Sequence, residues 1–407
     1  MEYITVSEAA AKWGVSTRRV QILCNQERIK GAVRFGPIWR IPETAVLPNA
    51  RRKNEAPSLP MPRKSPFLDM TNLYNRPGCA EENAEMLVNQ PEAHALFCAQ
   101  IAYRRGEIEK VYEQARYFLS SHSGFYAIIG GSMLLALCAL WRGDIELWYE
   151  AKRHLCEADC DTEEKRDIVS LTIATIDSSI YDNKDYPEWF TVGNFEILPA
   201  DAHPAAKVYY SKLLYMKAFG VATKQYDVPG MQGLSLMKLL PNTLEPLLTQ
   251  AVVDGTVIPE IYLRLACAVA YYNSEQREKA IAYVDRAVSL ALPDRLYGIL
   301  AEYVRHFSGL LEERIALQDQ KAADEVLRLY DRYIVGWSTL SGKVRNKDIA
   351  TNLTKREHEC AKLTAYGFSL SEVGRMLHIS PSSVQQALQR VYTKTRISGK
   401  EELAHIL

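Results

Sequence analysis

The sequence of 407 residues lacks the short motifs that mark the common classes of enzyme. It contains no phosphate-binding GxxxxGKS/T loop, no glycine-rich dinucleotide turn and no GxSxG turn for a serine nucleophile. No acidic cluster follows a predicted strand, so nothing indicates a phosphorylated receiver domain. We therefore expect neither an enzyme nor a bound cofactor, and we expect the function to lie in binding.

Two further absences bear on the cellular compartment and on metal binding. The eight cysteines are scattered and do not form the paired framework of a small secreted domain. His154, Cys156 and Cys160 lie close together, but no fourth ligand is nearby, and the first two would point apart on a helix. The first ten residues lack the pattern of a signal peptide. We expect a cytoplasmic protein with reduced thiols and no metal site.

Long hydrophobic runs are almost absent. The one long run covers residues 125–141, contains Gly130 and Gly131, and ends at the charged Arg142. It is shorter than the roughly 20 apolar residues that a membrane-spanning helix needs. We expect this run to form a buried helix and the protein to have no membrane partner.

The chain has no net charge, because its 49 basic residues balance its 49 acidic residues. Nucleic-acid-binding domains are usually basic, so the distribution of charge matters more than the total. Residues 1–53 have a net charge of +6, residues 352–407 have +3, and the segment between them has −9. Two basic terminal modules on an acidic body are the pattern expected of two phosphate-facing domains.

The last 55 residues contain a dense set of helix-start signals. Val384, Leu388 and Val391 recur there at helical spacing, which predicts a helix with one apolar and one polar face. Three Ser/Thr–Glu pairs have the spacing of a capping box, and one Ser-Pro pair predicts a further start. These pairs are Thr354 with Glu357, Ser369 with Glu372, Ser398 with Glu401, and Ser380 with Pro381. We expect four short helices.

The polar face of the third predicted helix has the chemistry of a DNA-reading helix. Glutamine reads adenine edges in the major groove, and arginine reads guanine edges or holds phosphate. The residues on this face are Ser382, Ser383, Gln385, Gln386, Gln389 and Arg390. A solvated polar face is the alternative, but the other helix starts in register favour DNA binding.

The motifs LTxREhE, GxSxxEV and LhIS, followed by V-x-x-x-L-x-x-V-Y-x-K, resemble the LuxR-type (GerE-like) helix-turn-helix domain. The resemblance covers residues 353–407 and implies that the third helix enters the major groove. The residues that would face the bases are Gln385, Gln386 and Gln389. It also implies that Lys394 contacts phosphate and that the fourth helix supports dimerisation. The sequence departs from the family at Gly374, at Thr395 and at Gln385, where a cation is usual, so the operator sequence does not transfer.

Residues 1–53 contain a second candidate DNA-binding module. Thr5 and Glu8 have capping-box spacing before a first helix, Gly14 ends that helix, and Ser16 would cap a second. Two β-type runs around a Gly-Pro pair predict a hairpin after it. The polar residues of the second helix and the hairpin that would face DNA are Thr17, Arg18, Arg19, Gln21, Arg34 and Arg40. This order of elements is that of a winged helix.

The pattern across residues 3–42, with YITVSEAA, WGVSxRRVQ and FGxxWxIP, resembles the excisionase-like, MerR-related winged helix-turn-helix domains. The resemblance implies that the second helix reads the major groove and that the hairpin touches the neighbouring backbone or minor groove. We expect Trp39 to belong to the core of the wing, and Arg34 and Arg40 to contact phosphates.

The middle of the chain predicts a linker followed by helical repeats. Residues 54–90 hold five prolines, which predicts a semi-extended linker. Within residues 91–345, the segments around Gly106 and Gly143 are similar, and a clear further copy lies near residues 270–290. The spacing of these similar segments along the chain resembles the period of a tetratricopeptide-type solenoid. The position of the repeats before a LuxR-type domain resembles that in MalT-like regulators. The expected fold is mainly α, with a winged helix-turn-helix before the solenoid and a four-helix LuxR-type domain after it.

These segments predict a bacterial transcriptional regulator that binds double-stranded DNA as a homodimer. Its repeat body would sense an unknown small-molecule or peptide ligand, and a tyrosine-lined groove would suit one, although helix packing explains any single tyrosine more simply. The alternative function is a protein-interaction scaffold whose terminal modules contact proteins. Leu403, Ile406 and Leu407 would form an apolar edge that packs on its own domain, on a partner copy or on the body.

Overall fold

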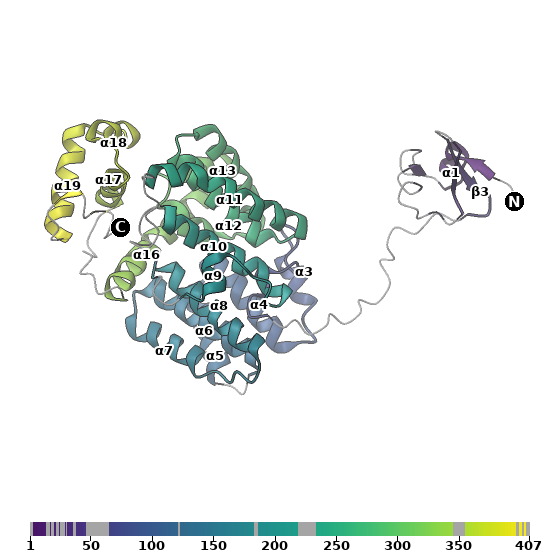
Figure 1. The fold of residues 1–407 in the computed structure, drawn as a ribbon, viewed down its shortest axis with the longest axis horizontal. Coiled ribbons are helices and arrows are strands. Elements are labelled where there is room, and N and C mark those ends of the chain that lie inside the picture. The colour runs from purple at the N-terminus through teal and green to yellow at the C-terminus, as the bar shows by residue number, and fades with distance from the viewer. Residues whose placement is uncertain are drawn as a thin grey trace. The chain divides into compact units, whose positions relative to one another are not determined.

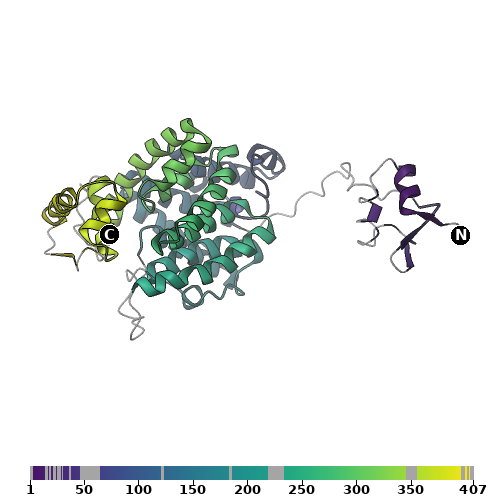
Figure 2. The same cartoon turned by 90° about the horizontal axis from the view of Figure 1, so that it is seen from above.

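The computed structural model is mainly helical (Figures 1 and 2). The chain divides into two compact units, Met1–Met61 and Pro62–Leu407. The structure describes residues 3–13, 17, 20–21, 24, 29, 31–35, 38–45, 65–120, 123–182, 186–218, 233–344, 355–395, 399–400 and 403.

The first unit contains a small antiparallel sheet with the strand order β1-β3-β2. Val33 of β2 pairs with Arg40 of β3, and Phe35 pairs with Ile38, so the predicted hairpin is present. The elements are β1 (Tyr3–Thr5), α1 (Val6–Trp13), β2 (Val33–Phe35) and β3 (Ile38–Pro42). Four residues of the second predicted helix are described as helical, namely Thr17, Val20, Gln21 and Cys24.

The predicted capping box starts helix α1. The Glu8 amide donates to the Thr5 hydroxyl at 3.2 Å, and the Thr5 amide donates to the Glu8 carboxylate at 2.7 Å. The bond from the Thr5 backbone lowers the pKa of Glu8, because it stabilises the charged carboxylate. Trp39 packs against the small core of this unit, as expected for a wing residue.

A helical body forms most of the second unit, and its helices pack side by side around one continuous hydrophobic core (Figures 1 and 2). After the 3-10 turn η1 (Leu68–Met70) and α3 (Ala80–Glu85), its helices are α4 (Pro91–Arg105), α5 (Ile108–Ser120), α6 (Phe125–Arg142), α7 (Ile145–Cys156), α8 (Glu163–Ser179), α9 (Glu188–Val192), α10 (His203–Ala218), α11 (Gly233–Asp254), α12 (Val257–Asn273), α13 (Arg277–Ala291), α14 (Tyr297–Val304), α15 (Leu310–Gln318) and α16 (Gln320–Val344), with further 3-10 turns η2 (Ala200–Ala202) and η3 (Leu292–Asp294).

Tight turns join consecutive helices at the positions where the sequence pattern repeats. Gly106 and Gly143 adopt φ angles of 84° and 67° at the ends of α4 and α6, a left-handed conformation that glycine adopts readily. At the third copy Glu275 takes the equivalent position with φ 62°. The helices on either side of each turn pack against each other. The sequence also contains a weaker copy of the pattern around Asn183, and this residue lies outside the described residues.

The predicted linker is wrong for its second half. The structure places residues 65–90 in the body, where Phe67, Met70 and Tyr74 are almost fully buried. Asp69 forms a buried ion pair with Arg104 of α4 at 2.6 Å. The prolines of this segment therefore join a packed structure, because apolar residues that follow them reach the core.

The long apolar run forms the buried helix α6, as predicted. Helix α6 is long and apolar enough to span a membrane by length and composition, but 78% of its apolar window is buried inside the protein. Its residues from Ile129 to Trp141 contact α5, α7 and α16. Gly130 and Gly131 allow this packing, because a methyl group on either would lie within 3 Å of Leu96 or Phe118.

Helices α9, α10 and α11 occupy much of the segment from residue 184 to residue 260, where no clear repeat is visible in the sequence. Helix α11 contains Pro241 and Pro246, and α9 is only five residues long. Proline inside a helix removes a backbone hydrogen bond, so a segment that contains proline is not normally predicted to be helical. The position of two prolines explains why periodicity alone could not place α11.

Candidate nucleic-acid interface

Three described helices form a separate small core at the C-terminal end of the chain. They are α17 (Lys355–Ala365), α18 (Leu370–Met376) and α19 (Pro381–Thr395). Helix α19 packs on both of the others, and its apolar residues Val384, Leu388 and Val391 are buried, as predicted. Leu403, from the fourth predicted helix, is also fully buried in this core. Leu403 therefore closes its own domain and does not form an exposed dimer edge; the other two residues of that edge lie outside the described residues.

Two side-chain caps fix where α18 and α19 begin. Ser369 and Glu372 form the predicted capping box, in which the Ser369 amide donates to Glu372 at 2.8 Å. This bond lowers the pKa of Glu372, because the charged form accepts it. The Ser380 hydroxyl accepts from the Ser383 amide at 3.1 Å before the proline that starts α19. The boxes predicted at Thr354 and Ser398 lie outside the described residues.

A tight turn sets the angle between α18 and α19. His378 adopts a left-handed backbone with φ 53°, and the Ile379 amide donates to the Gly374 carbonyl at 2.8 Å. A methyl group at Gly374 would lie 2.7 Å from the carbonyl oxygen of Ile379. Glycine at this position therefore permits a close approach that the side chain of alanine would obstruct.

The polar face of α19 is exposed, as the sequence predicted. Ser382, Ser383, Gln385, Gln386, Gln389 and Arg390 are all exposed to solvent. The hydroxyls of Ser382 and Ser383 each lie 2.8 Å from the hydroxyl of Ser380, so these two side chains are partly engaged in the cap. The glutamine side chains and the Arg390 guanidinium extend further from the helix than these serines, and can therefore reach further into a DNA groove. Lys394 belongs to α19, but its side chain lies outside the described residues.

The predicted residues of the first unit are only partly described. Thr17 and Gln21 are exposed and helical, and Arg34 and Arg40 are exposed on the hairpin. The Arg34 guanidinium lies 5.9 Å from the centroid of the Trp39 ring, which holds it beside the wing. Arg18 and Arg19 lie outside the described residues.

Sequence reasoning missed two cations near α19 and one contact with the body. Arg375 and Lys400 are exposed in the C-terminal domain. The position of Arg375 in the last turn of α18 was the available sequence signal for the first of them.

The Lys362 ammonium of α17 donates to the carbonyl of Arg305 in the body at 2.9 Å. Burial, with Arg305 nearby, lowers the pKa of Lys362 well below its usual range. No sequence pattern indicated this pairing, because it joins residues far apart in the chain.

The comparison with protein families identifies this part of the chain. Residues 351–407 match the family described as bacterial regulatory proteins, luxR family (GerE). No curated protein and no solved structure matches the chain. The matched segment contains α17, α18 and α19, their capped turns and the exposed polar face. Residues 351–407 therefore form a LuxR-family helix-turn-helix domain, and this domain supports DNA binding and transcription regulation as the activity of the protein.

Proposed function

We propose that the protein is a cytoplasmic bacterial transcriptional regulator in which the helical body, a tetratricopeptide-like solenoid, senses a signal and controls the terminal DNA-binding modules. The exposed polar face of α19 is the observation that carries this proposal. An α-helix with amide and guanidinium groups on one side fits the major groove, and its apolar side is held by Val384 and Leu388.

The base-reading residues in this proposal are Gln385, Gln386 and Gln389. Each glutamine amide can both donate to and accept from an adenine edge, so three of them favour adenine-containing sites. Arg390, at the end of the same face, supplies charge to a phosphate or to a guanine. Lys394, one turn further, would add a phosphate contact.

The first unit would act as a second DNA-binding module of the winged helix-turn-helix type. The net charge of +6 over residues 1–53 and the exposed Arg34 and Arg40 support phosphate contacts. A LuxR-family domain recognises a short half-site, so we propose that two chains bind together, with half-sites about one helical turn apart. The proposal includes no catalytic role and no cofactor.

A salt titration of the full-length protein with random duplex DNA tests the proposal. Each phosphate neutralised by the protein contributes about 0.9 to the slope of log affinity against log salt, so a regulator should give a steep negative slope. Arg390→Ala should make that negative slope shallower by about 1. Arg328→Ala is the matched control, because this arginine is exposed on α16 of the body and should leave the slope unchanged.

The alternative function, a protein-interaction scaffold, makes the opposite prediction. A scaffold whose terminal modules contact proteins would show no salt-dependent DNA binding, and Arg390→Ala would have no effect. A flat slope would therefore reject the regulator and favour the scaffold.

A further inference from the structure

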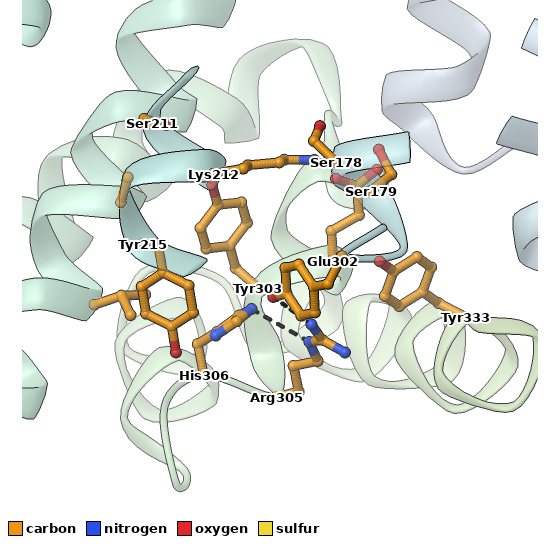
Figure 3. Close-up of a pocket in the computed structure, with 13 residues that line it drawn as sticks. Ser178, Ser179, Ser211, Lys212, Tyr215, Glu302, Tyr303, Arg305, His306 and Tyr333 are labelled. Carbon is orange, nitrogen blue, oxygen red and sulfur yellow. Dashed lines mark hydrogen bonds between the residues drawn. The ribbon is translucent and has the colours of Figure 1, made fainter. Parts of the chain in front are cut away.

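A small cavity lined by both polar and apolar side chains lies within the helical body (Figure 3). Helices α8, α10, α12, α14 and α16 all contribute to its wall, so distant parts of the chain meet there. Its volume is about 50 Å³. The charged or polar residues on its wall include Lys212, Tyr215, Glu302, Arg305 and His306, and Figure 3 shows them converging from separate elements.

Arg305 has an unusual environment for a buried cation. It is 8% exposed, and its Nη1 atom is buried without a hydrogen-bond partner. Its Nε donates to the Nε2 of His306 at 3.3 Å and its Nη2 donates to the hydroxyl of Tyr181, so neither bond supplies a carboxylate. The guanidinium stacks 3.8 Å from the centroid of the Trp337 ring. A buried charged donor without a partner is costly, and a bound acceptor would remove that cost.

A second cation lines the same cavity. The Lys212 ammonium lies 5.1 Å and 5.8 Å from the ring centroids of Tyr209 and Tyr262. Burial lowers the pKa of Lys212, and a bound anion would oppose this effect by stabilising the ammonium form. A negative charge between the two side chains would therefore stabilise the charged forms of both Arg305 and Lys212.

Glu302 is the acidic residue of the cavity wall, and its oxygens already have partners. The Tyr103 hydroxyl donates to Oε1 at 2.6 Å, and the Tyr262 hydroxyl donates to Oε2 at 3.2 Å. Two cations and one carboxylate leave one positive charge to be balanced. A monovalent anion would balance it, whereas a divalent phosphate would place excess negative charge beside Glu302.

We propose that this cavity binds a small monovalent carboxylate, with its oxygens on Arg305 Nη1 and on the Lys212 ammonium. Nη1 is the Arg305 nitrogen without a partner, so the guanidinium would supply one charge-assisted hydrogen bond and the ammonium a second. The rings of Tyr215, Tyr303 and Tyr333 would cover its apolar end. A dry cavity of about 150 Å³ accepts a benzene molecule, so a space of about 50 Å³ fits only the smallest carboxylates, formate and acetate.

The wall of the cavity is in direct contact with the DNA-binding domain. The hydroxyl of Tyr215 lies 2.6 Å from the hydroxyl of Tyr366, which directly follows α17. Lys362 of α17 donates to the backbone of Arg305 itself. A carboxylate that fixes Arg305 and Tyr215 therefore acts on the two residues that hold α17 to the body. This part of the inference rests on the proposed function, because it makes the carboxylate the signal that changes DNA affinity.

Isothermal titration of the full-length protein with sodium formate and sodium acetate tests the binding site. At least one of the two should bind saturably at millimolar concentrations, while sodium chloride and neutral acetamide should not. Lys212→Gln should weaken binding at least about tenfold, because it removes a charge-assisted hydrogen bond. Lys207→Gln is the matched control on the same helix, outside the cavity wall, and should bind like the unmodified protein.

Arg305→Lys provides a second variant that keeps the charge and loses the fork of donors. It should fold, as judged by circular dichroism, and still lose most of the carboxylate affinity. If no carboxylate binds, or if Lys207→Gln and Lys212→Gln bind equally well, the cavity assignment is overturned. Binding of acetamide with the same affinity as acetate would overturn the anionic class of the ligand.

A DNA titration with and without the tightest of these carboxylates, at constant ionic strength, tests the coupling. The carboxylate should change the DNA affinity severalfold, and DNA should change the carboxylate affinity by the same factor. Tyr366→Phe should remove most of this effect while leaving carboxylate binding intact; Tyr117→Phe, at an exposed site on α5, should not. Unchanged DNA affinity in the unmodified protein would overturn the coupling. A protein that binds the carboxylate but not DNA would instead overturn the proposed function and leave the cavity assignment standing.

Discussion

Substitution of Gly374 by alanine tests whether the tight turn between α18 and α19 has the geometry described. A methyl group there would lie 2.7 Å from the backbone carbonyl of Ile379 and 3.3 Å from the nitrogen of Pro381. These are backbone atoms at the start of the DNA-reading helix, so neither can move without shifting α19. Overpacking of this kind costs about 1–3 kcal/mol, and the obstruction by backbone places it toward the upper end.

The gain in helix propensity opposes this cost. Alanine is favoured over glycine inside a helix by about 1 kcal/mol. The net destabilisation of the α18–α19 turn should therefore be about 1–2 kcal/mol, which is a factor of roughly 5 to 30 in the population of opened states.

Amide hydrogen exchange on the full-length protein measures the effect locally. Peptides that cover α18 and α19 should exchange faster in Gly374→Ala, and DNA affinity should fall because the reading helix is displaced. Gly399→Ala is the matched control, since no atom lies within 4 Å of the added methyl group. Equal or slower exchange in Gly374→Ala would refute the close approach and show that the turn accommodates alanine.

Three further outcomes test the rest of the DNA-binding assignment. Gln386→Ala should cost about 1–3 kcal/mol on the preferred operator and little on random DNA, measured by fluorescence anisotropy; equal losses on both would show that this residue does not read bases. Leu403→Ala should destabilise the C-terminal domain by about 2–5 kcal/mol without a change in light scattering, whereas Leu317→Ala at an exposed site should be neutral in urea unfolding. Deletion of residues 1–53 should reduce the salt slope of DNA binding; an unchanged slope and footprint would remove the first unit from the DNA interface.

Local signals in the sequence predicted the local features of the DNA-binding domain. The capping box at Ser369, the cap at Ser380 and the buried stripe of Val384, Leu388 and Val391 depend only on neighbouring residues, and all of them are present. The exposed face of α19 follows from that stripe by helical geometry. Identification of the helices therefore needed no knowledge of the rest of the chain.

Features that depend on distant partners could not be predicted in this way. The contact between Lys362 and Arg305 joins two elements whose proximity has no sequence signature. The charge of the cavity likewise depends on residues from several helices. The sequence does not distinguish Tyr215, which lines the cavity, from a tyrosine such as Tyr262, which is almost fully buried between helices.

The wrong linker prediction has the same physical origin. Prolines between residues 57 and 66 indicate an extended chain, but the structure of the residues that follow depends on the side chains they pack against. Asp69 meets Arg104 of α4, and Tyr74 donates to Asp294 of η3, more than two hundred residues later. These polar contacts are buried together with Phe67, so the segment is part of the body.

Removal of the Asp69 charge should therefore destabilise the whole body. Asp69 is fully buried, and Arg104 is 2% exposed. Asp69→Asn would leave the Arg104 guanidinium buried without its counter-ion, and breaking a buried pair from one side costs about 3–5 kcal/mol. Urea unfolding of the full-length protein, followed by circular dichroism, should show a correspondingly lower midpoint.

The matched control and a double variant separate this explanation from general damage. The pair of Asp285 and Arg314 has a similar separation of 2.7 Å but is partly exposed, so Asp285→Asn should cost only about 0–1 kcal/mol. Asp69→Asn combined with Arg104→Met removes both charges, and should be less destabilising than the sum of the single changes because no unpaired charge remains. If Asp69→Asn instead unfolds at the same urea concentration as the unmodified protein, residues near 69 do not share the core. That result would restore the linker as the sequence predicted it and would move the start of the body to Pro91.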